Sequence, residues 1–120
     1  RLNRYLWEKE IYAAFKRYPV DIFGHPQQGM PKFLKPSKIK RLCQYAKKQD
    51  VALELNHLEE TKYMPMLEYG HEIGVKFSLG SDFHGFNDDL HAQLNHVQEM
   101  VELVEKYDLK LLDPAKFLKP

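Results

Sequence analysis

Apolar positions along the chain switch three times between strand-type and helix-type spacing. Short apolar runs at 20–23, 51–56 and 75–79 predict buried strands, and a segment with helical periodicity follows each of them. The strand starts lie about 25 to 31 residues apart, which is the usual length of a βα unit. The pattern therefore predicts an α/β protein with parallel strands and outer helices, and all strands should end at one edge of the sheet.

The clearest helix is predicted to follow Ser37, which is a natural N-cap residue after Pro36. Four residues in this segment fall at i, i+3, i+4 and i+7 and should form its buried face: Ile39, Leu42, Cys43 and Ala46. An opening helix should end near Arg17, because Tyr18-Pro19 disfavours helical geometry. The segment 27–36 lacks any periodicity and is expected to be a loop at the rim, where Lys32 and Lys35 could help to cover a ligand.

Two further helices are predicted in the second half of the chain. Pro65 suits the first turn of one helix, which should end with Gly74 as its C-cap. Asp88 or Asp89 can cap a longer helix. Its apolar stripe comprises Leu90, Leu94, Val97, Val101 and Val104. The tail at 109–112 fits either a short strand or a segment that packs against the rest of the domain.

Composition narrows the choice of partners. The chain has 120 residues, of which 43% are hydrophobic, and its 18 Lys and Arg nearly balance 17 Asp and Glu to a net charge of +1. Binding to nucleic acid is not expected from charge alone. Cys43 is the only cysteine, so no internal disulfide can form and a cytoplasmic location is expected. No apolar stretch approaches the roughly 20 residues of a membrane helix, so no membrane association is expected.

Polar side chains occur close to each predicted strand end: His25, then Glu54 and Asn56, then Asp82 and His84. Since the carboxyl ends of parallel strands meet at one edge, we expect these residues to lie together. The i, i+2 pair formed by Asp82 and His84 would present a carboxylate and an imidazole on the same side of extended backbone. Imidazole and carboxylate ligands without a thiolate suit Zn, Mn or Fe.

Each of these residues also has an ordinary structural explanation. Asp82 fits a turn or cap, and His25 and His84 fit solvated loops. Glu54 lies between two leucines in a predicted buried strand, where a carboxylate needs a hydrogen-bonding or ionic partner. Asn56 also fits a turn at the strand end. The remaining histidines, in or beside helical segments, are expected at the surface: His57, His71, His91 and His96.

The later motifs of the polymerase and histidinol phosphatase (PHP) family resemble three segments of this chain in order and spacing. These segments are Asp21-Ile22-Phe23-Gly24-His25-Pro26, Glu54-Leu55-Asn56 and Gly80-Ser81-Asp82-Phe83-His84. The resemblance covers residues 18 to 106 or so, and the Gly-Ser-Asp-x-His segment is its most specific part. It implies a distorted seven-stranded TIM-like (βα)7 barrel that binds two or three divalent ions, Zn, Mn or Fe.

The resemblance also implies roles for individual residues. His25, Asp82 and His84 match metal-ligand positions, and Asp82 and His84 would be catalytic through the metal cluster that they hold. Glu54 and Asn56 match a pattern that lines the site, where they would contact substrate or support the ligands. A metal-activated water would hydrolyse a small phosphomonoester, as in histidinol phosphatases.

The family's opening His-x-His pair and the ligands that follow it have no counterpart in this chain. Residues 1–120 are therefore interpreted as a partial PHP domain, the second half of the barrel, with the N-terminal half not in this chain. The lack of an initiator Met supports the same expectation. Activity without the missing half, the exact substrate and the oligomeric state stay open. So do two other functions, a noncatalytic or polymerase-associated PHP scaffold module and a C–N hydrolase on a related metal barrel.

Overall fold

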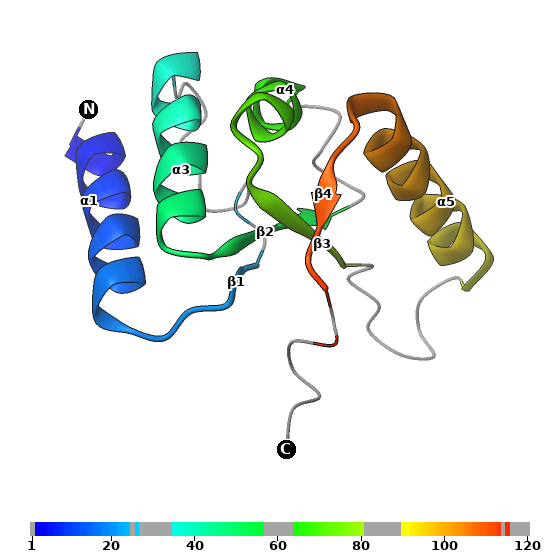
Figure 1. The fold of residues 1–120 in the computed structure, drawn as a ribbon, viewed down its shortest axis with the longest axis horizontal. Coiled ribbons are helices and arrows are strands. Elements are labelled where there is room, and N and C mark those ends of the chain that lie inside the picture. The colour runs from blue at the N-terminus through cyan, green and yellow to red at the C-terminus, as the bar shows by residue number, and fades with distance from the viewer. Residues whose placement is uncertain are drawn as a thin grey trace.

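Helices and strands alternate along the chain in the computed structural model, which describes residues 2–24, 26, 35–56, 64–80, 90–113 and 115. The elements are α1 (Leu2–Arg17), β1 (Ile22–Phe23), α3 (Pro36–Lys48), β2 (Ala52–Asn56), α4 (Met64–Ile73), β3 (Lys76–Gly80), α5 (Leu90–Tyr107) and β4 (Lys110–Leu111) (Figure 1). The expected alternation is confirmed, and the tail contributes the short fourth strand.

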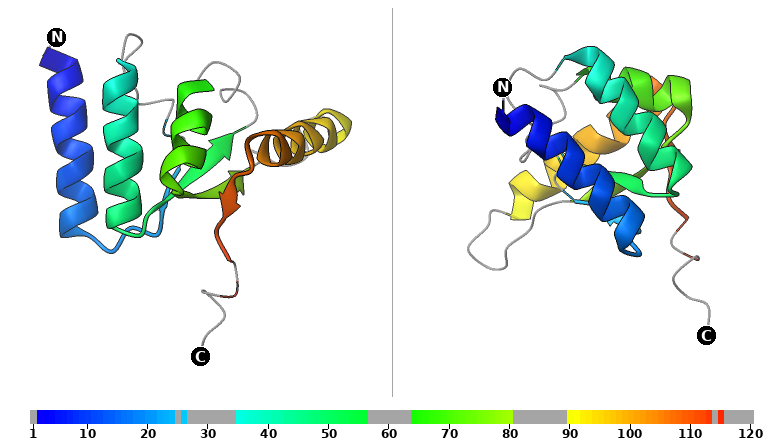
Figure 2. Two further views of the ribbon diagram at one scale, coloured as in Figure 1. Left: turned by 45° about the horizontal axis from the view of Figure 1, so that its top comes forward. Right: turned by 90° about the vertical axis from the view of Figure 1, so that its left-hand side faces the viewer.

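The four strands form one parallel sheet in the order β1-β2-β3-β4, which is also their order in the chain. A helix connects each strand to its neighbour, and crossovers of the same hand that always step in the same direction place the connecting helices α3, α4 and α5 on the same face. Figures 1 and 2 show the helices arranged in this way along one side of the sheet. The fold class predicted from the sequence, α/β with parallel strands and outer helices, is confirmed.

The connections from α3, α4 and α5 to the strands that follow them are tight turns with a left-handed residue. Asp50 (φ 55°) follows α3 and Asp108 (φ 50°) follows α5, while Gly74 (φ 81°) ends α4 as predicted. After α3, the Val51 amide donates to the Ala46 carbonyl at 2.8 Å, and the Asp50 amide donates to the Lys47 carbonyl at 3.1 Å. This is the Schellman pattern, which satisfies carbonyls left open at the helix end. The next strand therefore begins almost immediately after each of these three helices.

One detail of the predicted helices is wrong. Helix α3 begins at Pro36, and its N-cap is Lys35, which makes no side-chain capping bond, so Ser37 lies inside the first turn. Proline is well suited to this first position because it has no amide to leave unpaired. Ile39, Leu42, Cys43 and Ala46 are nevertheless all buried, as the spacing predicts.

The apolar stripe of α5 is largely exposed at its described positions. Leu94 is 61% exposed, Val97 37% and Val101 36%, whereas Met100 on the adjacent face is 1% exposed. The helix packs through Met100 and its last two turns, where Leu103, Val104 and Tyr107 are partly buried against the core. Helical spacing correctly identified an apolar face but did not indicate which part of it the described core covers. The predicted caps, Asp88 and Asp89, lie outside the described residues.

The core lies between the helices and one face of the sheet. Leu53 and Leu55 on β2 and Phe77 on β3 are fully buried, and the residues between them on the strands face the other way. Helix α4 approaches β3 closely at Gly70. A Cβ added to Gly70 would lie 2.6 Å from Cε2 of the Phe77 ring, so the ring occupies the space that any side chain there would need.

Helix α1 packs against α3 through aromatic rings and one buried carboxylate. The Tyr12 and Tyr45 ring centroids are 4.6 Å apart, which brings the two helices into contact. Glu8 is 7% exposed and accepts hydrogen bonds from Lys38 Nζ at 2.9 Å and from Arg41 Nε at 2.7 Å. Burial works to raise the pKa of Glu8, but the bonds from Lys38 and Arg41 outweigh it, so the pKa lies below its usual value.

Replacement of Glu8 by glutamine is expected to lower the free energy of unfolding by roughly 1–2 kcal/mol at pH 7, because charge-assisted bonds to two cations are lost. The folded-state pKa of Glu8 lies below the reference value of 4.5, so its contribution is present above about pH 4.5 and is lost as the pH falls through the folded pKa. Urea unfolding of wild type and Glu8→Gln should therefore converge as the pH is lowered towards 3.

The matched control is Glu10→Gln, two residues along the same helix, where the side chain is exposed. Its effect on the unfolding free energy should stay within about 0.5 kcal/mol at both pH values. Equal losses in the two variants, or a Glu8→Gln effect that is independent of pH, would contradict the role assigned to Glu8.

Candidate active site at the carboxyl edge of the sheet

The carboxyl ends of β1, β2 and β3 lie at the same edge of the sheet, because neighbouring strands are parallel and in register. Gly24 directly follows β1, Asn56 ends β2 and Gly80 ends β3, with Asn56 paired opposite Gly80. The predicted convergence of the strand ends is therefore confirmed. The three predicted metal ligands, His25, Asp82 and His84, lie outside the described residues, so their assignment stays a prediction.

Glu54 is the one predicted site residue whose side chain is described. It pairs with Ser78 across the β2–β3 ladder, and it lies on the sheet face opposite the leucine core. Its side chain is half-buried, and its carboxylate lies near Gly80, the last residue of β3, and Gly24, which follows β1. A Cβ added to Gly80 would lie 2.7 Å from Glu54 Cδ and 2.8 Å from Oε2, and one added to Gly24 would lie 3.9 Å from Oε2. For Asn56, the structure describes the backbone only.

This arrangement brings a carboxylate to the position where the sequence predicts a metal site. His25 follows Gly24 in the chain, and Asp82 follows Gly80 by two residues, so both segments start from glycines that Glu54 approaches. A carboxylate beside histidine ligands is a common way to fix imidazole orientation at a metal. Glu54 therefore fits such a site. Among the residues that the structure describes, no three His, Cys, Asp or Glu side chains lie close enough to hold an ion by themselves.

The sequence pattern did not indicate why Gly24 and Gly80 are glycines. The structure shows that the absence of a side chain at Gly80 creates the space for Glu54. Glycine in a strand is a known sign that another group approaches closely, so Gly80 itself could have indicated the approach of a neighbouring side chain.

Other reactive side chains are placed away from this edge or are inert. Cys43 is fully buried in α3, and burial raises the pKa of its thiol to about 12, so it stays protonated. This agrees with its interpretation as a small core residue. His71 and His91 are exposed on helices, as expected, and His96 is half-buried. His57 lies outside the described residues.

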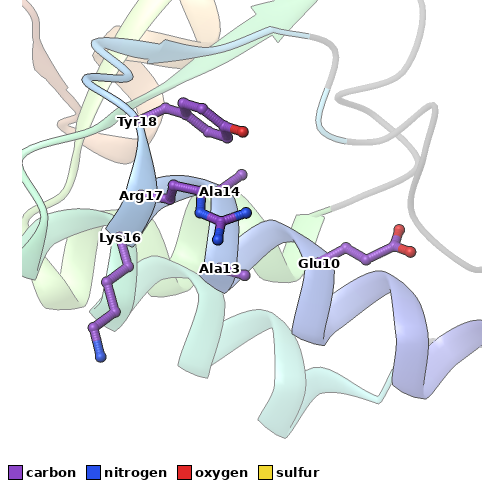
Figure 3. Close-up of a pocket in the computed structure, with 6 residues that line it drawn as sticks. All are labelled: Glu10, Ala13, Ala14, Lys16, Arg17 and Tyr18. Carbon is purple, nitrogen blue, oxygen red and sulfur yellow. The ribbon is translucent and has the colours of Figure 1, made fainter.

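Surface hollows are lined by other parts of the chain. One, about 510 Å³, is lined by α1 and the residue after it: Glu10, Ala13, Ala14, Lys16, Arg17 and Tyr18 (Figure 3). It presents one carboxylate and two cations from a single helix, and these groups do not converge as catalytic groups do. Another, about 250 Å³, has Lys47, Lys76 and Lys110 in its lining. Lys47 Nζ donates to the Ile73 carbonyl at 2.7 Å, so this lysine serves the C-terminal end of α4.

The architecture and the position of Glu54 define a parallel α/β protein whose carboxyl edge is the expected ligand-binding edge. In such folds, the loops that follow the strands carry the functional groups. No helix within the described ranges combines the length and apolar character needed to span a membrane.

Two curated proteins are similar to this chain, and both are named "Probable phosphatase". One, from Aliivibrio fischeri strain ES114, is 31% identical over 108 residues, and the other, from strain MJ11, is 32% identical over 108 residues. Each match covers 82% of this chain, whereas the chain spans only 40% of the length of either relative. No family model and no solved structure matches the chain. The resemblance to the PHP family thus stays a prediction.

Proposed function

We propose that this chain is part of a metal-dependent phosphatase of the PHP type. The observation that carries the proposal is the position of the Glu54 carboxylate beside Gly24 and Gly80, because the predicted ligands follow these two glycines in the sequence. The two similar proteins named as phosphatases support phosphoester hydrolysis as the reaction. The same names favour phosphate esters over the C–N bonds of the alternative hydrolase.

The proposed architecture is the second half of a TIM-like barrel. Strands of such a barrel follow one another in chain order with every helix outside, which is the order seen here. Within the part of the chain that the structure describes, β1 and β4 are the two outermost strands of the sheet, each with one side unpaired in this sheet. A strand from the remainder of the barrel would pair with each edge. The length of the relatives, of which the chain spans 40%, leaves room for these strands.

His25, Asp82 and His84 would hold the metal ions, which supply an activated water and stabilise charge on the phosphoryl oxygens. Other side chains of the chain would position the ligand side chains and the substrate. Glu54 can accept a hydrogen bond from an imidazole N–H, which fixes the ring orientation and leaves the other ring nitrogen available as a ligand. Asn56, at the end of the same strand, would orient the substrate. We propose a small phosphomonoester as substrate, with no role for nucleic acid.

Chelation tests the proposed function directly. The protein expressed from its whole coding region should hydrolyse p-nitrophenyl phosphate, and EDTA followed by desalting should abolish this activity. Mn²⁺ or Zn²⁺ should restore it, because the reaction requires the bound ions. Bis-p-nitrophenyl phosphate serves as the diester control and should react much more slowly.

Hydrolysis that survives complete metal removal would contradict metal dependence. Cleavage of amide substrates without cleavage of phosphate esters would instead support the C–N hydrolase. A protein that binds no metal and cleaves neither class would support the scaffold module.

A further inference from the structure

The side chain of Glu54 runs diagonally across the sheet instead of lying over its direct partner. Its backbone pairs with Ser78, but its carboxyl carbon lies beside Gly80, two residues further along β3. Diagonal neighbours on one sheet face are within reach of a long side chain. The carboxylate is thus carried from the middle of β2 to the point where β3 ends.

The absence of a side chain at Gly80 is what makes this position available. A Cβ there would lie 2.7, 2.8 and 3.0 Å from Cδ, Oε2 and Cγ of Glu54, closer than the van der Waals contact distance of about 3.5 Å. Position 80 requires glycine for reasons of space and not of backbone conformation, because among the described glycines only Gly74 has a positive φ. Glycine otherwise weakens a strand, so the backbone alone gives no reason for it at position 80.

Gly24 is the matched case on the other side of the same carboxylate. Among the described residues, a Cβ there would meet only Glu54 Oε2, at 3.9 Å, which is ordinary van der Waals contact. An alanine at position 24 therefore leaves Glu54 in place, whereas an alanine at position 80 requires the carboxylate to move.

We propose that Gly80 is a positioning residue that acts through Glu54. The space it leaves directs the Glu54 carboxylate to the start of the segment Ser81-Asp82-Phe83-His84, where the carboxylate orients an imidazole of the metal site. This role rests on the proposed phosphatase function. It assigns to Gly80 a task that neither its backbone conformation nor its place at a strand end requires.

The test is a double-mutant cycle in the full protein with Gly80→Ala, Glu54→Ala and their combination, and with Gly24→Ala as control. Gly80→Ala and Glu54→Ala should each lower kcat by roughly 10- to 100-fold and weaken Mn²⁺ binding to a similar degree, because both misplace a group that orients a ligand. The combination should be no worse than Glu54→Ala, since residues that act as one unit are not additive. Gly24→Ala should stay within about twofold of wild type, given the 3.9 Å separation.

A second readout keeps the proposal separate from the proposed function. The midpoint of urea unfolding should show the same non-additivity between positions 80 and 54, because the steric conflict exists whether or not the protein hydrolyses phosphate. Losses that add in the combined variant, in kcat or in the midpoint, would overturn the positioning role, as would a Gly24→Ala loss as large as that of Gly80→Ala. Wild-type protein that lacks metal-dependent hydrolysis would overturn the proposed function instead.

Discussion

Asp82→Ala and His84→Ala are each expected to lower kcat/KM for p-nitrophenyl phosphate by at least about 100-fold. Changes to groups that merely orient metal ligands already cost roughly 10- to 100-fold, so loss of a ligand should cost no less. Both variants should also lose bound Mn, Zn or Fe, measured by elemental analysis of protein purified without added metal. The measurement therefore has two independent readouts, activity and metal content.

His71→Ala is a suitable control, because it removes an exposed histidine from α4, and α4 ends at the opposite edge of the sheet. Its activity and metal content should match wild type. Unchanged metal content in both Asp82→Ala and His84→Ala would disprove the ligand assignment, whatever happens to the rate.

Phe77→Ala is expected to lower the free energy of unfolding by roughly 3–5 kcal/mol, the usual cost of removing a fully buried aromatic ring. The ring fills the space between β3 and α4 at Gly70, so its removal leaves a cavity there. Urea unfolding monitored by circular dichroism measures the effect. Leu111→Ala is the control, because that side chain is 46% exposed, and it should cost less than about 1 kcal/mol.

The same contact gives a second check on this interpretation. Gly70→Ala should be destabilising in wild type, where the new methyl group meets the ring, and much less so in Phe77→Ala, where the ring is absent. Equal costs in the two backgrounds would show that Gly70 and Phe77 are not in the contact described.

The architecture was predictable because it depends on local patterns that tertiary packing did not override. The apolar spacing at Ile39, Leu42, Cys43 and Ala46 identified the buried face of α3, and Gly74 was recognised as the end of α4. The regular spacing of βα units then predicted the parallel sheet.

The errors arose where a residue's role depends on the rest of the structure. Ser37 lies within α3 because Pro36 fits the first position of the helix, and a serine one residue later then has no cap to form. Leu94, Val97 and Val101 repeat at helical spacing, but burial depends on which other elements reach that face of α5. The hydrogen bond from Arg41 to Glu8 joins residues 33 apart in the sequence, so no local pattern indicates it.

For the candidate site, the sequence predicted the edge of the sheet at which side chains should converge. It did not predict the path that the Glu54 side chain takes to that edge. Parallel strands bring the carboxyl ends of β1, β2 and β3 to one edge, and this follows from topology alone. The diagonal reach of Glu54 to Gly80 depends on the register between β2 and β3, which the sequence does not reveal.

The connections at the amino ends of the strands are short and those at the carboxyl ends are longer, so the two edges of the sheet tolerate sequence changes differently. At the amino edge, residues 49–51, 74–75 and 108–109 connect α3, α4 and α5 to the next strand. An insertion there would break the turn and shift the register of a strand. At the carboxyl edge, the connections run over 24–35, 57–63 and 81–89. Longer connections accept substitutions and insertions with little cost in stability. Substrate preference can therefore diversify among related proteins at the carboxyl edge, while the amino edge keeps the architecture unchanged.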